Sequence, residues 1–199
     1  MGAIVLAVLS SFALGTYGHG VNDIVFMSSR DGLNFDRSFM EAFIRPGLDF
    51  GNWHDRGIYF EVGVLHTGDT EMSMYGMENA HLPPQRIRRY ALRTDGFVSF
   101  HAGYGGGAFT TRPFVFAGDE LELNYSTSAV GHVKVELQDE SGAALNGYSL
   151  TDSQELFGDE IAGTIGWRDD GANIGALAGQ TVRMRVELRD ADLFAFRFR

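Results

Sequence analysis

The sequence predicts an all-β protein: a jelly-roll-like antiparallel β-sandwich over residues 95–199, preceded by a region of shorter strands over residues 1–94. Polar and apolar residues alternate in several segments, which is the period of a strand with one buried face. No segment sustains a helical period. The chain holds 26 glycines and only 4 prolines, so glycine supplies most of the turns that many short strands require.

The apolar N-terminus allows three interpretations. Residues 1–20 contain no Lys, Arg, Asp or Glu. We favour a buried strand pair at 4–9 and 12–17. A signal peptide is the alternative, although the basic n-region is missing. A membrane anchor is the third, although polar residues interrupt the apolar run before it reaches the length of a span. The compartment therefore stays open between cytoplasm and export, and no membrane partner is expected.

The rest of the first region contains short strands and clear turn signals. Asp31-Gly32 predicts a hairpin turn that Phe35 closes. A single helical turn is expected at 38–43, before Pro46 and Gly47 end it. Strands are expected at 21–27, 58–65, 71–77 and 86–92.

The second region alternates more regularly. Strands are expected at 97–101, 110–114, 121–125, 133–137, 181–189 and 193–198, with a glycine loop at 103–107. In 181–189 the apolar residues Val182, Met184, Val186 and Leu188 share one face. The intervening Arg183, Arg185 and Arg189 are predicted to lie on the solvated face.

Charge and cysteine content exclude several functions. There are 16 basic and 26 acidic residues, a formal net charge of -10, and no cysteine. The negative charge opposes binding to a polyanion, so nucleic acid is not an expected partner. The lack of cysteine excludes disulfides, thiolate nucleophiles and thiolate zinc sites.

Four segments carry a resemblance to a known group of proteins. They are 88–99 (RRYALRTDGFVS), 105–113 (GGGAFTTRP), 124–131 (NYSTSAVG) and 182–196 (VRMRVELRDADLFAF). Together they resemble the C-terminal region of bacterial glycosyl-hydrolase-like proteins, which join a five-bladed β-propeller to a C-terminal β-sandwich. The segment 29–35 is similar to a turn hairpin of a propeller blade.

The resemblance implies propeller-blade-like strands before the sandwich and a carbohydrate-related function. It also implies an N-terminally truncated relative, because about 90 residues hold two blades at about 45 residues each. The catalytic carboxylates of such propellers come largely from earlier blades. The truncation therefore favours carbohydrate binding over catalysis.

Two carboxylates are nevertheless candidates for glycoside hydrolysis, which requires a general acid and a nucleophile or base. Glu61 lies in an apolar strand, and Glu78 precedes His81. The three residues are the candidate catalytic set. The alternative is that Glu61 points outward and is merely solvated.

Aromatic and polar residues around Trp53 are candidates for saccharide binding. Aromatic rings pack against the apolar faces of sugars, and polar side chains bind the hydroxyls. The alternative is that Trp53 seals its loop onto the core and that Asp55 pairs with Arg56. The candidate substrate-binding residues are Trp53, His54, Asp55, Arg56, Tyr59 and Trp167.

No cofactor is expected. The acidic residues Asp152, Asp159, Glu160, Asp169 and Asp170 surround Trp167 and could hold a structural Ca²⁺, although a solvated acidic rim is the favoured interpretation. The histidines lack the spacing of a zinc hydrolase, so no metal residues are assigned.

The sequence thus predicts a carbohydrate-binding or carbohydrate-processing protein with a saccharide ligand. A glycosidase using Glu61 and Glu78 is the first alternative, and an esterase using Ser126 or Ser128 with His132 is a weaker form of it. The second alternative is a structural domain without a ligand, which forms homo-oligomers through exposed strand edges.

Overall fold

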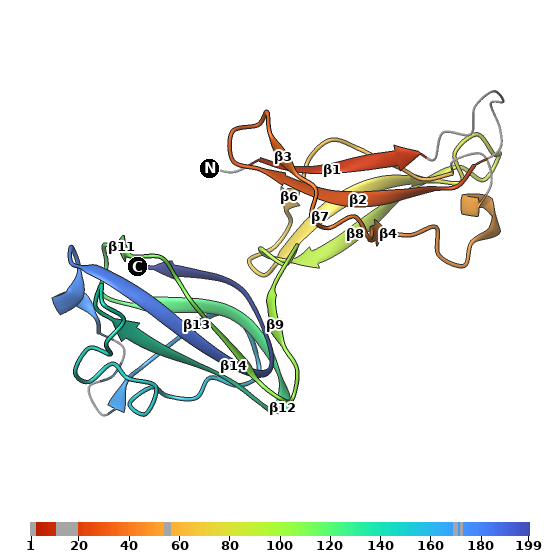
Figure 1. The fold of residues 1–199 in the computed structure, drawn as a ribbon. Helices are drawn as coiled ribbons and strands as arrows, with labels where there is room; N and C mark the ends of the chain where they lie inside the picture. The colour runs from red at the N-terminus through yellow and green to blue at the C-terminus, as the bar shows by residue number, and fades with distance from the viewer. Residues whose placement is uncertain (1–2, 11–19, 54–56, 169–170, 172) are drawn as a thin grey trace. The chain divides into compact units, whose positions relative to one another are not determined.

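The computed structural model describes residues 3–10, 20–53, 57–168, 171 and 173–199. It confirms the all-β prediction, because antiparallel strands dominate and the described helices are the short 3₁₀ segments η1 (Phe50–Trp53) and η3 (Gly175–Leu177). The chain divides into two compact units, Met1–Leu92 and Arg93–Arg199 (Figure 1). Within the described ranges, no helix is long and apolar enough to cross a membrane.

The first sheet of the first unit has four antiparallel strands arranged around β2. These are β1 (Ala3–Ser10), β2 (Asn22–Ser29), β3 (Phe35–Asp36) and β4 (Ala42–Ile44). The expected strand at 12–17 lies outside the described residues. The predicted hairpin is confirmed: Ser29 pairs with Phe35, and the Asp31 carboxylate accepts the Leu33 and Asn34 N–H groups at 2.8 Å each.

The helical turn predicted at 38–43 is wrong. Residues 42–44 form β4 instead, and Ile44 pairs with Ile24 of β2. Phe43 packs against Phe26 with ring centroids 6.2 Å apart, and Phe39 does so at 6.3 Å. Pairing with β2 and contact with its aromatic side chain outweigh the local helical preference, which is weak over so few residues.

The second sheet of the first unit has four strands arranged around β7. These are β5 (Tyr59–Phe60), β6 (Leu65–His66), β7 (Glu71–Glu78) and β8 (Arg86–Arg93). The single strand predicted at 58–65 is broken between β5 and β6, which both pair with β7. Gly63, at φ 115°, lies in this break, where the chain bulges out of the ladder.

One buried side chain joins the two sheets of the first unit. The Asn22 Oδ1 atom accepts the Ile58 N–H at 3.3 Å, and its Nδ2 donates to the Ile58 carbonyl. Asn22 and Ile58 are almost completely buried, together with Ile24, Met72 and Met74. A buried amide with both functions paired stabilises one arrangement of neighbouring strands.

The second unit is built around two long strands. Its six-stranded antiparallel sheet contains β9 (Phe100–Ala102), β10 (Gly107–Thr110), β11 (Phe114–Val115), β12 (Leu121–Gln138), β13 (Asp159–Thr164) and β14 (Thr181–Phe198). β12 and β14 have 18 residues each and pair along their lengths. The strands expected at 121–125 and 133–137 are therefore parts of β12, joined across a register shift between Thr127 and His132.

The hydrophobic core of the second unit follows the predicted alternation. Val182, Met184, Val186 and Leu188 of β14 are buried together with Leu121, Leu123, Val133, Val135 and Leu137 of β12. Arg183, Arg185 and Arg189 occupy the intervening positions and are half-buried. The alternation thus identifies which face of β14 contacts the core.

Candidate functional site

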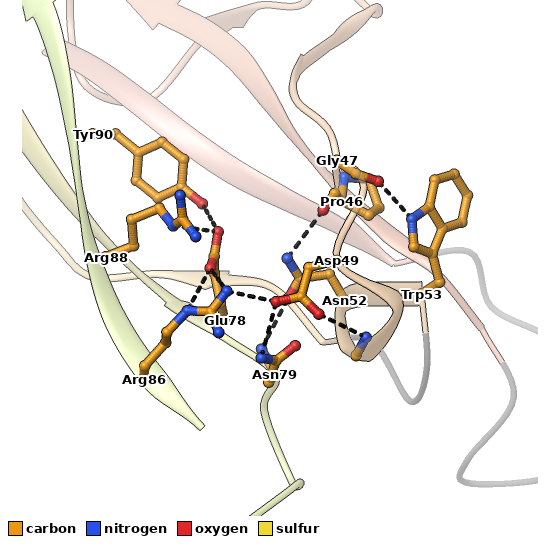
Figure 2. Close-up of polar contacts among 11 residues, drawn as sticks. Pro46, Gly47, Asp49, Asn52, Trp53, Glu78, Asn79, Arg86, Arg88 and Tyr90 are labelled. Carbon is orange, nitrogen blue, oxygen red and sulfur yellow. Dashed lines mark hydrogen bonds and ion pairs between the residues drawn. The ribbon is translucent and has the colours of Figure 1, made fainter. Parts of the chain in front are cut away.

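Glu78 lies at the end of β7 with its carboxylate enclosed by three side chains of β8 (Figure 2). Arg86 Nε and Nη2 contact Oε2 at 3.0 and 2.8 Å. Arg88 Nε and the Tyr90 hydroxyl reach Oε1 at 2.8 and 2.7 Å. A carboxylate has about four acceptor positions, so these contacts use the hydrogen-bonding capacity of Glu78.

The electrostatics of the cluster hold Glu78 in its ionised form. Burial alone raises the pKa of Glu78, but hydrogen bonds from Tyr90, Arg86 and Arg88 outweigh this effect and lower the pKa below its usual value. Burial and the neighbouring carboxylate together raise the pKa of Tyr90. Proton exchange at neutral pH is therefore disfavoured for both groups.

The three predicted catalytic residues occupy different environments. Glu78 is saturated, whereas Glu61 is exposed in the break after β5. His81 is also exposed, with its backbone at φ 65°. Within the described parts of the chain, no hydrogen bond or ion pair connects these side chains to one another. The contacts around Glu78 favour a structural role for this residue, and its pairing with Glu61 as acid and nucleophile stays a prediction.

The same network extends to the loop before η1. Arg86 Nη2 also contacts Asp49 Oδ2 at 2.5 Å, and Asn79 Nδ2 donates to the same oxygen at 3.3 Å. The Asn79 backbone N–H donates to Asn52 Oδ1 at 2.8 Å. Asn52 Nδ2 in turn donates to the Pro46 carbonyl at 3.0 Å. This sequence of contacts fixes the loop 46–53 to the end of β7.

Trp53 is the exposed aromatic residue at the end of this fixed loop. Trp53 is 54% exposed. Its indole N–H donates to the Gly47 carbonyl at 2.7 Å. Figure 2 shows Asp49 and Asn52 between Glu78 and Trp53. Leu48 and Phe50 in the same loop are also largely exposed. This exposure does not fit the alternative in which Trp53 seals the loop onto the core.

Of the other predicted binding residues near Trp53, the structure describes only Tyr59. Tyr59 is half-buried in β5, and its ring meets the His81 ring edge-to-face at 6.0 Å. His54, Asp55 and Arg56 lie outside the described residues. The structure thus positions Trp53 and Tyr59 in the first unit.

Trp167, predicted to bind substrate, lies in the core of the second unit. It is 2% exposed, its indole N–H donates to the Val135 carbonyl at 2.9 Å, and its ring meets Tyr148 edge-to-face. A ring covered on all sides has no face for a sugar, so this assignment is corrected to a packing role.

The acidic residues near Trp167 have other partners. Asp152 binds the Ser149 hydroxyl at 2.7 Å and pairs with Arg168, and Asp159 pairs with Arg93 at 2.5 Å. Asp169 and Asp170 lie outside the described residues. Within the ranges that the structure describes, no group of three or more His, Asp or Glu side chains is arranged to hold a metal ion.

Sequence reasoning missed the partners of Glu78. Arg86, Arg88 and Tyr90 follow each other at a period of two along β8, which places them on one face of a strand. That spacing beside the acidic end of a neighbouring strand was the available signal. The contribution of Asn79 and Asn52 had no comparable signal, because their contacts join segments 27 residues apart.

Comparisons with known proteins add no relative. No family model, curated protein or solved structure matches the chain at a significant level.

Proposed function

We propose that this protein binds carbohydrate without hydrolysing it, and that the surface of loop 46–53 carrying Trp53 makes the contact. The observation that carries this proposal is the exposed indole ring, held by its hydrogen bond to Gly47 on a loop that Asp49 and Asn52 fix. A fixed ring loses little conformational entropy when it stacks on a sugar. The ligand class follows from the resemblance to glycosyl-hydrolase-like proteins that four segments of the sequence predict.

The state of Glu78 favours binding over catalysis. Hydrolysis requires one carboxyl group to donate a proton and another to act as nucleophile or base. Glu78 is ionised and saturated by Arg86, Arg88 and Tyr90. The carboxylate therefore supports the framework from which the loop projects.

The proposal is tested by titrating the full chain with neutral mono- and oligosaccharides in a calorimeter, while product release is assayed in parallel. We expect saturable binding to at least one saccharide and no release of reducing ends. Trp53→Ala should weaken that binding at least tenfold, because truncation removes the stacking surface.

The matched control is Phe157→Ala, which removes another exposed aromatic side chain, one that belongs to the second unit. Its saccharide affinity should equal that of the wild type. Equal losses in both variants, or no binding of any saccharide, would contradict the proposal. Turnover that Glu78→Gln abolishes would restore the glycosidase alternative.

A further inference from the structure

A second candidate site lies wholly within the second unit. Three strands are adjacent there: Leu188 of β14 pairs with Gly107 of β10 and with Val133 of β12. Leu188 contacts the core, so its neighbours Glu187 and Arg189 project from the opposite face of the sheet. An open cavity of about 630 Å³ lies on that face, and Tyr104, His132, Glu187 and Arg189 contribute to its walls.

The glycine loop 103–107 forms one wall and is fixed to β14. Gly106 N–H donates to the Gly103 carbonyl at 2.9 Å, and Asp190 N–H donates to the same carbonyl at 3.0 Å. Tyr104 extends from this loop, and the Arg189 guanidinium lies over its ring with Cζ 4.3 Å from the centroid. The stacked pair holds the guanidinium at the edge of the cavity.

The opposite wall depends on the close approach of β12. His132 lies directly across from Arg189 in the ladder. A Cβ atom on Gly131 would lie 2.6 Å from the Arg189 carbonyl oxygen, so only glycine permits this approach. The backbone therefore holds residues 132 and 189 directly opposite each other in the ladder.

Three polar groups of this cavity lack hydrogen-bond partners within the described chain. Neither the His132 nor the Glu187 side chain makes a hydrogen bond or ion pair there, and the buried Arg189 Nε has no acceptor. Lys134, across from Glu187 in the ladder, contacts Glu155 at 3.5 Å instead. The cavity therefore offers unpaired donors and acceptors to a polar ligand.

We propose that this cavity binds a small hydroxylated monocarboxylate of the sugar-acid type. A planar guanidinium recognises a carboxylate through paired hydrogen bonds. An ionised Glu187 only accepts hydrogen bonds, so it pairs with hydroxyl donors on the ligand. It also repels a ligand that carries further negative charges. The volume of about 630 Å³ falls within the range of small-molecule sites.

The experiment is a calorimetric titration of the full chain with glucuronate, glucose and citrate at one ionic strength. Glucuronate should bind saturably, and glucose, which lacks the carboxylate, should bind at least tenfold more weakly. Citrate should also bind more weakly, because Glu187 opposes its extra charge. Equal affinity for glucose and glucuronate, or no saturable binding of glucuronate, would overturn the proposal.

Two variants locate the contact. Arg189→Met should reduce glucuronate affinity at least tenfold, whereas Arg112→Met removes an exposed arginine outside the cavity and should leave it unchanged. Glu187→Gln should retain glucuronate binding and reduce the ratio of glucuronate affinity to citrate affinity. This variant keeps the proposal testable if Arg189→Met does not fold. Unchanged glucuronate affinity in Arg189→Met, or an unchanged preference in Glu187→Gln, would refute it.

The two sites are separable by mutation. Trp53→Ala should not alter the affinity for glucuronate, and Arg189→Met should not alter the affinity for neutral saccharides. Loss of glucuronate binding in Trp53→Ala would assign that ligand to the first unit and contradict the site in the second.

Discussion

At the scale of single residues, Glu78 and Glu61 show how environment separates two similar side chains. Both lie in or beside apolar strands of the first unit. Glu78 is buried and accepts hydrogen bonds from Arg86, Arg88 and Tyr90, whereas Glu61 is exposed. Removing the charge should therefore have different consequences at the two positions.

Glu78→Gln should lower the free energy of unfolding at pH 7 by about 2 kcal/mol, because a buried charge-assisted network loses its anion. The loss is moderate because solvent screens the half-exposed Arg86 and Arg88 partners. Chemical denaturation measures it. Glu61→Gln is the matched control and should change stability by less than about 0.5 kcal/mol. Similar losses in both variants would contradict the structural role of Glu78.

The stabilisation from Glu78 should also depend on pH. The pKa of Glu78 is lowered in the folded state, so the folded protein releases this proton more readily than the unfolded chain. The contribution is complete above the unfolded carboxyl pKa of about 4.3 and is lost as pH falls through the lowered folded value. The stability difference between wild type and Glu78→Gln should shrink over that acid range. A difference independent of pH would argue against an ionised Glu78.

At the scale of elements, the register shift in β12 places His132 opposite Arg189. Gly131→Ala would force a side-chain atom against backbone carbonyls of β14, and overpacking of this kind costs about 2 kcal/mol. Thermal unfolding measures the loss. Gly105→Ala is the control, because an added Cβ there meets no atom within 4 Å. Equal unfolding midpoints for Gly131→Ala and Gly105→Ala would contradict this prediction.

The strands also show what the pattern of residues predicts and what it leaves undetermined. Alternation identifies Val182, Met184, Val186 and Leu188 as the buried face of β14, as the structure confirms. It does not show that 121–125 and 133–137 belong to one strand, because their continuity appears only in their common pairing with β14, across a register shift. The local pattern of residues predicts which face of a strand is buried, whereas tertiary contacts determine where the strand begins and ends.

The two tryptophans illustrate the same limit at the candidate site. Trp53 is exposed and Trp167 is buried, although both stand near acidic residues and glycines in the sequence. The contact that buries Trp167 involves Val135, 32 residues away. Nothing local distinguishes the ring that faces solvent from the ring that fills a core.

At the scale of the whole molecule, the division into two compact units gives the second unit its own core. Every residue of its main hydrophobic cluster lies between Ala102 and Phe198. Arg93, the first residue of this unit, donates to Asn124 Oδ1 at 2.7 Å. The unit therefore contains the contacts that a folded domain requires.

A fragment spanning 93–199 should fold on its own. It retains Trp167 as the only tryptophan, so near-ultraviolet circular dichroism reports directly on the packing of its core. We expect a rigid aromatic signal that is lost in one cooperative thermal transition. A fragment without that signal or transition would show that the second unit depends on the first.

The most direct test of carbohydrate binding at loop 46–53 uses the two indole N–H groups as reporters. Trp53 donates to Gly47 and Trp167 donates to Val135, so a ¹⁵N-labelled protein gives one indole signal from each environment, assigned with Trp53→Phe. On addition of the neutral saccharide that binds most tightly, the Trp53 signal should shift saturably while the Trp167 signal stays in place. A shift confined to Trp167, or two static indole signals during saturable binding, would contradict the account.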